Sequence, residues 1–154
     1  METALKTARA WLLDFGQGFR GAVGLHEMSQ VLLSVDLFKL PCTPQYCQEV
    51  FIFQNRILPV LDIVRLLTGR PITRSAGNII GVALYQAEPT QPIHYGGLYL
   101  STMPSSIVVS DAQAATLAAE KKHYWRPFAI SGFSLEGDTI PILNIAAFFT
   151  RQLS

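Results

Sequence analysis

The sequence predicts a mainly β fold, a barrel or a sandwich, from three observations. Short apolar runs recur along the chain and are separated by turn residues at close spacing. Only one segment, from Asp111 to about Lys122, has the alanine content and the end charges of a longer helix. A parallel sheet built from β–α–β units would need several such helices, so that architecture fits the sequence poorly.

The first part of the chain is expected to contain a hairpin. Residues 4–10 are interpreted as a short helix or a loose arm. Trp11–Phe15 and Phe19–Leu25 are apolar runs joined by Gly16-Gln17-Gly18, the pattern of two strands and a glycine-rich turn. From Leu25 to Leu33 the apolar residues fall at helix-like spacing over a short window.

A second hairpin is predicted in the middle of the chain. Val50–Phe53 and Arg56–Ile63 are apolar strands, and Asn55 between them tolerates the positive φ of a tight turn. A helical turn at 64–67 should follow. Asp62 lies at the end of the second strand, where a carboxylate usually caps such a turn.

The second half repeats this strand pattern. Residues 71–77 are small and polar, bounded by proline and glycine, so a junction between two subdomains of a single domain is placed near 69–78. Ser110 and Gln113 form a capping-box pattern before the expected helix. Further strands are expected at 79–85, 95–102, 106–109, 128–135 and 139–145, and a helical tail at 146–153.

Composition narrows the function classes. Hydrophobic residues make up 49% of the 154 and charged residues 15%, below the roughly 25% of soluble domains, which favours apolar surface patches for partners. A net charge of +1 without a basic block argues against nucleic-acid binding. No apolar segment is long enough for membrane insertion, and no signal peptide is recognised, so a cytoplasmic location with reduced cysteines is expected.

The sequence offers little for catalysis or cofactors. Cys42 or Cys47 could pair with a histidine, but no local nucleophile motif accompanies either thiol. The spacing Cys42-x4-Cys47 lies outside the common zinc patterns, and no phosphate-binding glycine motif occurs. We therefore expect no enzymatic activity, no metal and no cofactor.

Aromatic residues are mostly expected in the core. Tyr124 and Trp125, beside Arg126-Pro127, have the composition of an interface anchor, although a core position is favoured for them too.

The segment Val50–Ile63 resembles the central signature of the CheW-like domain family, the adaptor modules of bacterial chemosensory arrays. An apolar strand, a short polar turn and Pro-apolar-apolar-Asp-apolar follow one another there. The resemblance extends over nearly the whole chain. Its other pieces are Trp11–Phe15, Phe19–Leu25, Met28–Val31, Lys39–Pro41, Gly97–Met103, Ile130–Phe133 and Asp138–Ile145.

The resemblance implies two five-stranded SH3-like barrels packed on a shared hydrophobic core, with short helices. Pro59–Ile63 and Pro141–Ile145 share one pattern and would supply one closing strand to each barrel. Family members are not enzymes. They couple the regulatory domain of a CheA-type histidine kinase to the cytoplasmic tip of a chemoreceptor, for example in systems that control type IV pili. One barrel contacts the kinase, and a groove between the barrels holds the receptor helix.

The chain departs from the family pattern at positions expected to touch partners. Gln54 stands where the family has the arginine of Asn-Leu-Arg-Gly, and Glu49 replaces the glycine that opens that strand. Met28-x-Gln30 occupies the positions where the family has Val-x-Glu. The candidate partner-binding residues are Met28, Gln30, Val31, Glu49 and Gln54. The alternative is a structural or regulatory protein of the same fold that self-associates or binds another partner.

Overall fold

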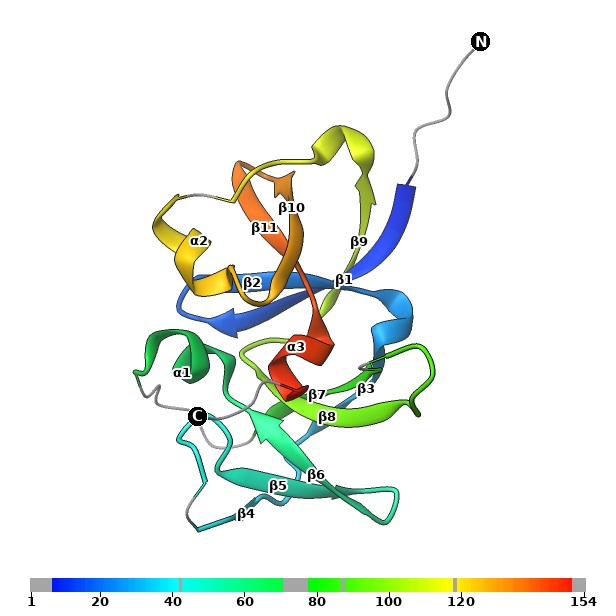
Figure 1. The fold of residues 1–154 in the computed structure, drawn as a ribbon, viewed down its shortest axis with the longest axis vertical. Coiled ribbons are helices and arrows are strands. Elements are labelled where there is room, and N and C mark those ends of the chain that lie inside the picture. Colours follow the sequence, from blue (N-terminus) through cyan, green and yellow to red (C-terminus); the bar gives the residue numbers. More distant parts are fainter. Residues whose placement is uncertain (1–6, 42, 71–77, 87, 118, 151–154) are drawn as a thin grey trace.

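The computed structural model describes residues 7–41, 43–70, 78–86, 88–117 and 119–150. They form two sheets stacked one above the other, with short helices between and beside them (Figure 1). The prediction of a mainly β fold of two SH3-like barrels with short helices is confirmed, although one of the two sheets has six strands where five were predicted.

One sheet has five strands in the order β10-β11-β2-β1-β9. They are β1 (Thr7–Gly16), β2 (Phe19–Gly24), β9 (Ser105–Ser110), β10 (Ala129–Leu135) and β11 (Asp138–Leu143). Strands from the beginning and the end of the chain thus share one sheet. β11 lies parallel to β2 through Ile142 and Ala22, and the other neighbours are antiparallel.

The other sheet has six strands in the order β3-β7-β8-β6-β5-β4. They are β3 (Met28–Leu33), β4 (Phe38–Lys39), β5 (Glu49–Phe53), β6 (Arg56–Leu61), β7 (Ile79–Tyr85) and β8 (His94–Leu100). β6 and β8 are parallel. The predicted junction at 69–78 stays a prediction, because residues 71–77 lie outside the described residues; β6 and β7 on either side of it share this sheet.

Three two-residue hairpin turns among the described residues have Gly or Asn, which tolerate positive φ, at their second position. Gln17-Gly18, Gln54-Asn55 and Glu136-Gly137 all have positive φ at both positions. Such turns match the right-handed twist of the flanking strands. The two predicted hairpins are therefore confirmed, and the strands predicted at 128–135 and 139–145 pair as a third.

The described residues form five short helical segments, four between strands and one after the last strand. They are η1 (Leu25–Glu27), α1 (Ile63–Thr68), η2 (Asp111–Gln113), α2 (Ala119–Trp125) and α3 (Ile145–Thr150). Asp62 caps α1 as predicted, because its Oδ1 accepts a hydrogen bond from the Arg65 amide at 3.2 Å. The described part of the expected tail, residues 146–150, is helical, and 151–153 lie outside the described residues.

Two local predictions near the N-terminus are wrong. Residues 7–10 belong to β1 rather than to a helix or a loose arm, and 4–6 lie outside the described residues. The helix-like spacing in Leu25–Leu33 instead covers η1 followed by β3. Pairing with β7 makes Met28–Leu33 a strand, since a segment this short has little helical preference of its own.

The helix expected from Asp111 to Lys122 is divided. Gln113 closes one turn, with its Oε1 accepting from the Ser110 amide at 2.9 Å. The Ala115 amide then donates to the Gly132 carbonyl at 3.0 Å, so the chain pairs with β10 instead of continuing the helix. Helical structure resumes only at α2. Tertiary pairing here outweighs the alanine-rich composition.

The largest apolar core lies between the two sheets and is called the shared core below. Buried residues from both sheets, α1, α2 and α3 contribute to it. They are Leu13, Phe15, Phe19, Val23, Leu61, Ile63, Val64, Ala83, Leu98, Leu100, Trp125, Phe128, Leu143, Ile145 and Phe148. Each sheet also encloses a smaller cluster of its own.

Trp125 belongs to this shared core and not to an exposed anchor. Its side chain is 1% exposed, and its ring centroid lies 6.2 Å from that of Phe15 and 5.9 Å from that of Phe19. Tyr124 is half-buried, with its ring 5.5 Å from Phe19. The favoured core interpretation therefore holds for Trp125.

Replacing Trp125 with alanine should lower the free energy of unfolding by about 3–5 kcal/mol, because the change opens a cavity in the shared core. Unfolding in urea, followed by circular dichroism, measures the loss. Ile93→Ala is the control, since Ile93 is 55% exposed, and its effect should stay below about 0.5 kcal/mol. Similar small effects for both variants would contradict the buried role of Trp125.

Candidate partner-binding surfaces

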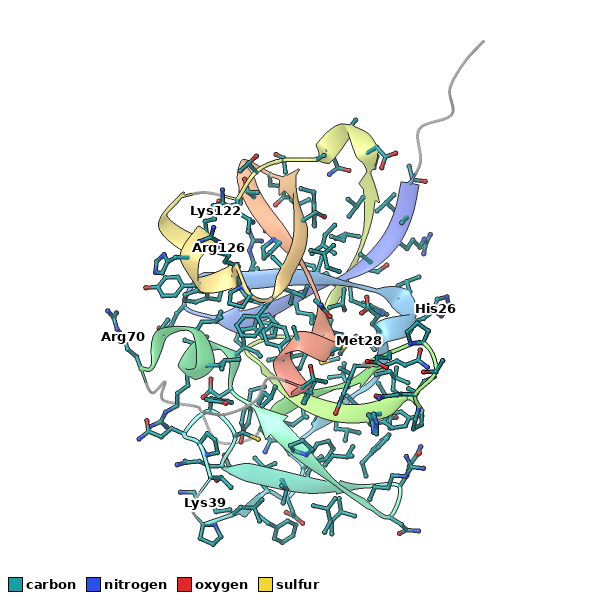
Figure 2. All side chains as sticks on the ribbon, viewed as in Figure 1. His26, Met28, Lys39, Arg70, Lys122 and Arg126 are labelled. Carbon is teal, nitrogen blue, oxygen red and sulfur yellow. The ribbon has the colours of Figure 1, made fainter. Side chains whose placement is uncertain are left out.

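The structure separates the five predicted partner residues into two groups. Met28, Gln30 and Val31 lie on β3, at one end of the six-strand order. Glu49 and Gln54 lie at and just beyond the two ends of β5, on the other side of β7, β8 and β6. Figure 2 shows Met28 near the middle of the molecule and Lys39, on the strand next to β5, at its lower edge.

On β3, only one of the three predicted residues is freely accessible. Gln30 is exposed, whereas Met28 and Val31 are half-buried. The methyl group of Met28 occupies the space beside Gly81, where a Cβ would come within 2.6 Å of it. An irregularity in register between Met28 and Gln30 turns this edge of the sheet.

Glu49 is half-buried and has a hydrogen-bond partner within the protein. Its Oε1 accepts a hydrogen bond from the Tyr99 hydroxyl at 2.5 Å, across the sheet from β8. A polar hollow of about 250 Å³ lies beside this pair and is also lined by Lys39 and Arg65. The departure from glycine at position 49 thus has a structural explanation within the chain.

Gln54 is exposed at the tip of the β5–β6 hairpin, where its φ is 49°. Its side chain extends from a tight turn and makes none of the hydrogen bonds found among the described residues. The position is accessible to a partner, but its amide carries no charge and lacks the five-donor guanidinium fork of arginine.

An exposed apolar surface adjoins this turn, and the sequence interpretation missed it. Ile52 and Ile57 are opposite each other on β5 and β6, with exposures of 60% and 72%. Phe38 and Leu40, 51% and 43% exposed, extend this surface away from the turn, because Phe38 is opposite Val50 and the Leu40 amide donates to the Gln48 carbonyl. These four residues are called the hairpin face below.

Strand alternation could have identified the hairpin face. Phe51 and Phe53 are buried at 0% and 6%, so Ile52 between them must point to the opposite face of the sheet. Residues directly opposite on antiparallel strands share a face, which places Ile57 with Ile52. Exposed apolar residues gathered in this way are typical of protein-binding surfaces.

No thiol–imidazole pair is assembled in the described part of the chain. Cys47 is half-buried, and burial raises the pKa of its thiol, which reduces the thiolate available at neutral pH. His94 and His123 instead have ring contacts with Tyr85 and Tyr124. Among the described residues, no cluster of three or more His, Cys, Asp or Glu could hold a metal ion.

No helix within the described ranges has the length and apolarity needed to cross a membrane.

Comparison with solved structures identifies the architecture. The chain superposes on the crystal structure of the scaffolding protein TtCheW from Thermoanaerobacter tengcongensis with a TM-score of 0.74. The protein has a CheW-like fold. The alignment covers 93% of this chain and 88% of that chain at 13% sequence identity. No protein-family model matches the sequence, and no curated protein matches it.

This CheW-like fold is the one that the resemblance implied. At 13% identity the comparison concerns the fold alone, so partner contacts depend on the surfaces of this chain. Of the five predicted residues, Gln30 and Gln54 present exposed side chains, and Glu49 is engaged internally.

Replacing Tyr99 with phenylalanine should lower the free energy of unfolding by about 1–2 kcal/mol, because the Glu49 carboxylate loses its donor. Glu49→Ala should have a much smaller effect in the Tyr99→Phe background than alone, a coupling of about 1 kcal/mol in a double-mutant cycle. Additive effects would argue that Glu49 has no internal role and is free for a partner. Urea unfolding of the four proteins gives the answer.

Proposed function

We propose that the protein is a non-enzymatic, cytoplasmic adaptor that couples a CheA-type histidine kinase to chemoreceptors. The observation that carries this proposal is the hairpin face, an apolar surface beside the turn where the family has its coupling arginine. Burial of such a face against another protein would stabilise a complex at about 25 cal/mol per Å² before the entropic cost of association.

The two exposed regions are assigned to different partners in this proposal. The hairpin face and Gln54 would contact the regulatory domain of the kinase. The β3 edge, with Gln30 exposed and Met28 and Val31 beside it, would contact the receptor tip. An adaptor needs two such surfaces because it must hold both partners at once. A system that controls type IV pili is one setting for this activity.

The absence of an assembled nucleophile among the described residues is consistent with a binding role. The raised pKa of the half-buried Cys47 thiol makes it a poor nucleophile at neutral pH. Apolar burial with a polar rim, rather than a chemical step, would provide the free energy of the interaction.

Charge placed on the hairpin face should weaken kinase binding. Ile52→Glu and Ile57→Glu should each raise the dissociation constant for the kinase regulatory domain at least about tenfold, because a carboxylate would be buried in an apolar interface. Isothermal titration calorimetry measures this constant. Both side chains are largely exposed, so the free energy of unfolding should be nearly unchanged.

Ile93→Glu is the matched control, since Ile93 is also exposed but lies outside the hairpin face. It should leave kinase binding as it is. Absence of binding by the unmodified protein at tens of micromolar would contradict the adaptor proposal. Equal weakening by all three variants would contradict the assignment of the surface.

A second candidate is a protein of this fold that no longer couples a kinase and instead self-associates or binds another partner. Ile52 favours it, because an exposed isoleucine stands where the family pattern has asparagine. Gln54→Arg combined with Gln30→Glu separates the two candidates. Gain of kinase binding would indicate a weakened adaptor, and concentration-dependent dimerisation in sedimentation, abolished by Ile52→Glu, would indicate self-association.

A further inference from the structure

We propose that the five-stranded sheet contains a binding site for a small, neutral and mainly apolar molecule. The site is a hollow of about 700 Å³ bounded by β1, β2, β9, β10 and η2. It is called the β1–β10 hollow below. Pockets that bind small molecules commonly have volumes of about 300–1,000 Å³ and apolar walls. The proposal does not depend on the adaptor function, since no predicted partner residue lines this hollow.

Small side chains along the five-stranded sheet leave room for the hollow. Ala8, Ala10, Ala22 and Ala114 line it. The cluster within this sheet has three buried residues with six partly buried ones packed against it, whereas the cluster within the six-stranded sheet has seven and four. Protein interiors are normally close-packed, so an apolar space of this size is a place that a ligand can fill.

The cluster enclosed by the six-stranded sheet shows which side chains fill the corresponding space there. There Phe51, Phe53 and Tyr99 contribute aromatic rings to the enclosed cluster. In the five-stranded sheet, Phe133 is the only aromatic residue of the enclosed cluster, and it lines the hollow at 1% exposure. A ligand of one or two rings would supply the apolar volume that the chain does not.

The walls set the charge of the ligand. Val23, Ile142 and Phe133 line the hollow, and the described core contains no buried charged side chain. Burying an ionised group without a partner is strongly unfavourable. The part of the ligand inside the hollow must therefore be neutral.

The charged residues that line the β1–β10 hollow also disfavour an anionic ligand. Glu27 and Asp111 contribute two carboxylates against one guanidinium, that of Arg9. Glu27 is held in place because its Oε1 accepts a hydrogen bond from the Gly24 amide at 2.8 Å. Ser110 and Ser131, also at the hollow, can meet a hydroxyl or an amine. A polar end of this kind fits better than a carboxylate or a sulfonate.

Two fluorescent dyes with similar aromatic bodies test the proposal. N-phenyl-1-naphthylamine is neutral, and 8-anilinonaphthalene-1-sulfonate carries a negative charge. The full chain should raise the fluorescence of the neutral dye with a dissociation constant in the micromolar range, roughly −8 kcal/mol. The anionic dye should bind at least about tenfold more weakly, because its sulfonate meets the acidic mouth.

Variants locate the binding. Ala10→Phe should weaken binding of the neutral dye at least about tenfold, because the new ring occupies the hollow. Ala8→Leu, nearer the mouth, gives a milder test if Ala10→Phe folds poorly. Ala112→Phe is the control, since Ala112 is exposed on η2 and does not line the hollow.

The outcomes are distinct from those of the kinase-binding experiments. Selective loss of neutral-dye binding in the Ala8 and Ala10 variants supports the site. No fluorescence increase with the unmodified protein, equal binding by all variants, or tighter binding of the anionic dye would each overturn the proposal.

Discussion

Everything else in the structure depends on the shared apolar core between the two sheets. Neither sheet is self-sufficient, because its own enclosed cluster is smaller than the one it shares with its neighbour. Two helices reinforce this arrangement, because each follows a strand of one sheet and packs against the other sheet. α1 follows β6 of one sheet and contacts β1 of the other, whereas α3 follows β11 and contacts β7 of the first. Burial of apolar surface thus joins the sheets into one body, whose outer rims remain available to other molecules.

The sequence pattern shared by Pro59–Ile63 and Pro141–Ile145 explains why a helix from each half packs against the other sheet. Pro59 and Pro141 lie on β6 and β11, each within a hairpin whose second strand runs parallel to a strand from elsewhere in its sheet. Asp62 and Asn144 then precede α1 and α3, which begin at isoleucines buried in the shared core. The echo between the two halves is therefore a structural repeat: hairpin, helix start and a helix that packs across the interface (Figure 1).

The hairpins and most strands could be predicted because their signals are local. Gln17-Gly18 and Glu136-Gly137 carry their turn conformation in two residues, and alternation assigns the faces of the strands beside them. The structure of the segment after Ser110 could not be predicted in this way. The hydrogen bond between the Ala115 amide and the Gly132 carbonyl links positions far apart in the sequence. The hydrogen bond of Glu49 within the chain could not be predicted for the same reason. Its partner, Tyr99, lies on a distant strand, so the residue resembled a surface substitution in the sequence alone.

The departures from the family pattern are compatible with the fold because the structure accommodates each of these side chains. Position 54 needs a residue that tolerates positive φ, and glutamine does so at 49° while its side chain stays in solvent. Position 49 needs a partner for whatever polar group it carries, and the Tyr99 hydroxyl supplies one. Ile52 points to the outer face of its strand, where its side chain is not packed in the core, whereas Phe51 and Phe53 are buried on the inner face. Surface residues of this hairpin can therefore change without altering the shared core, which lies elsewhere.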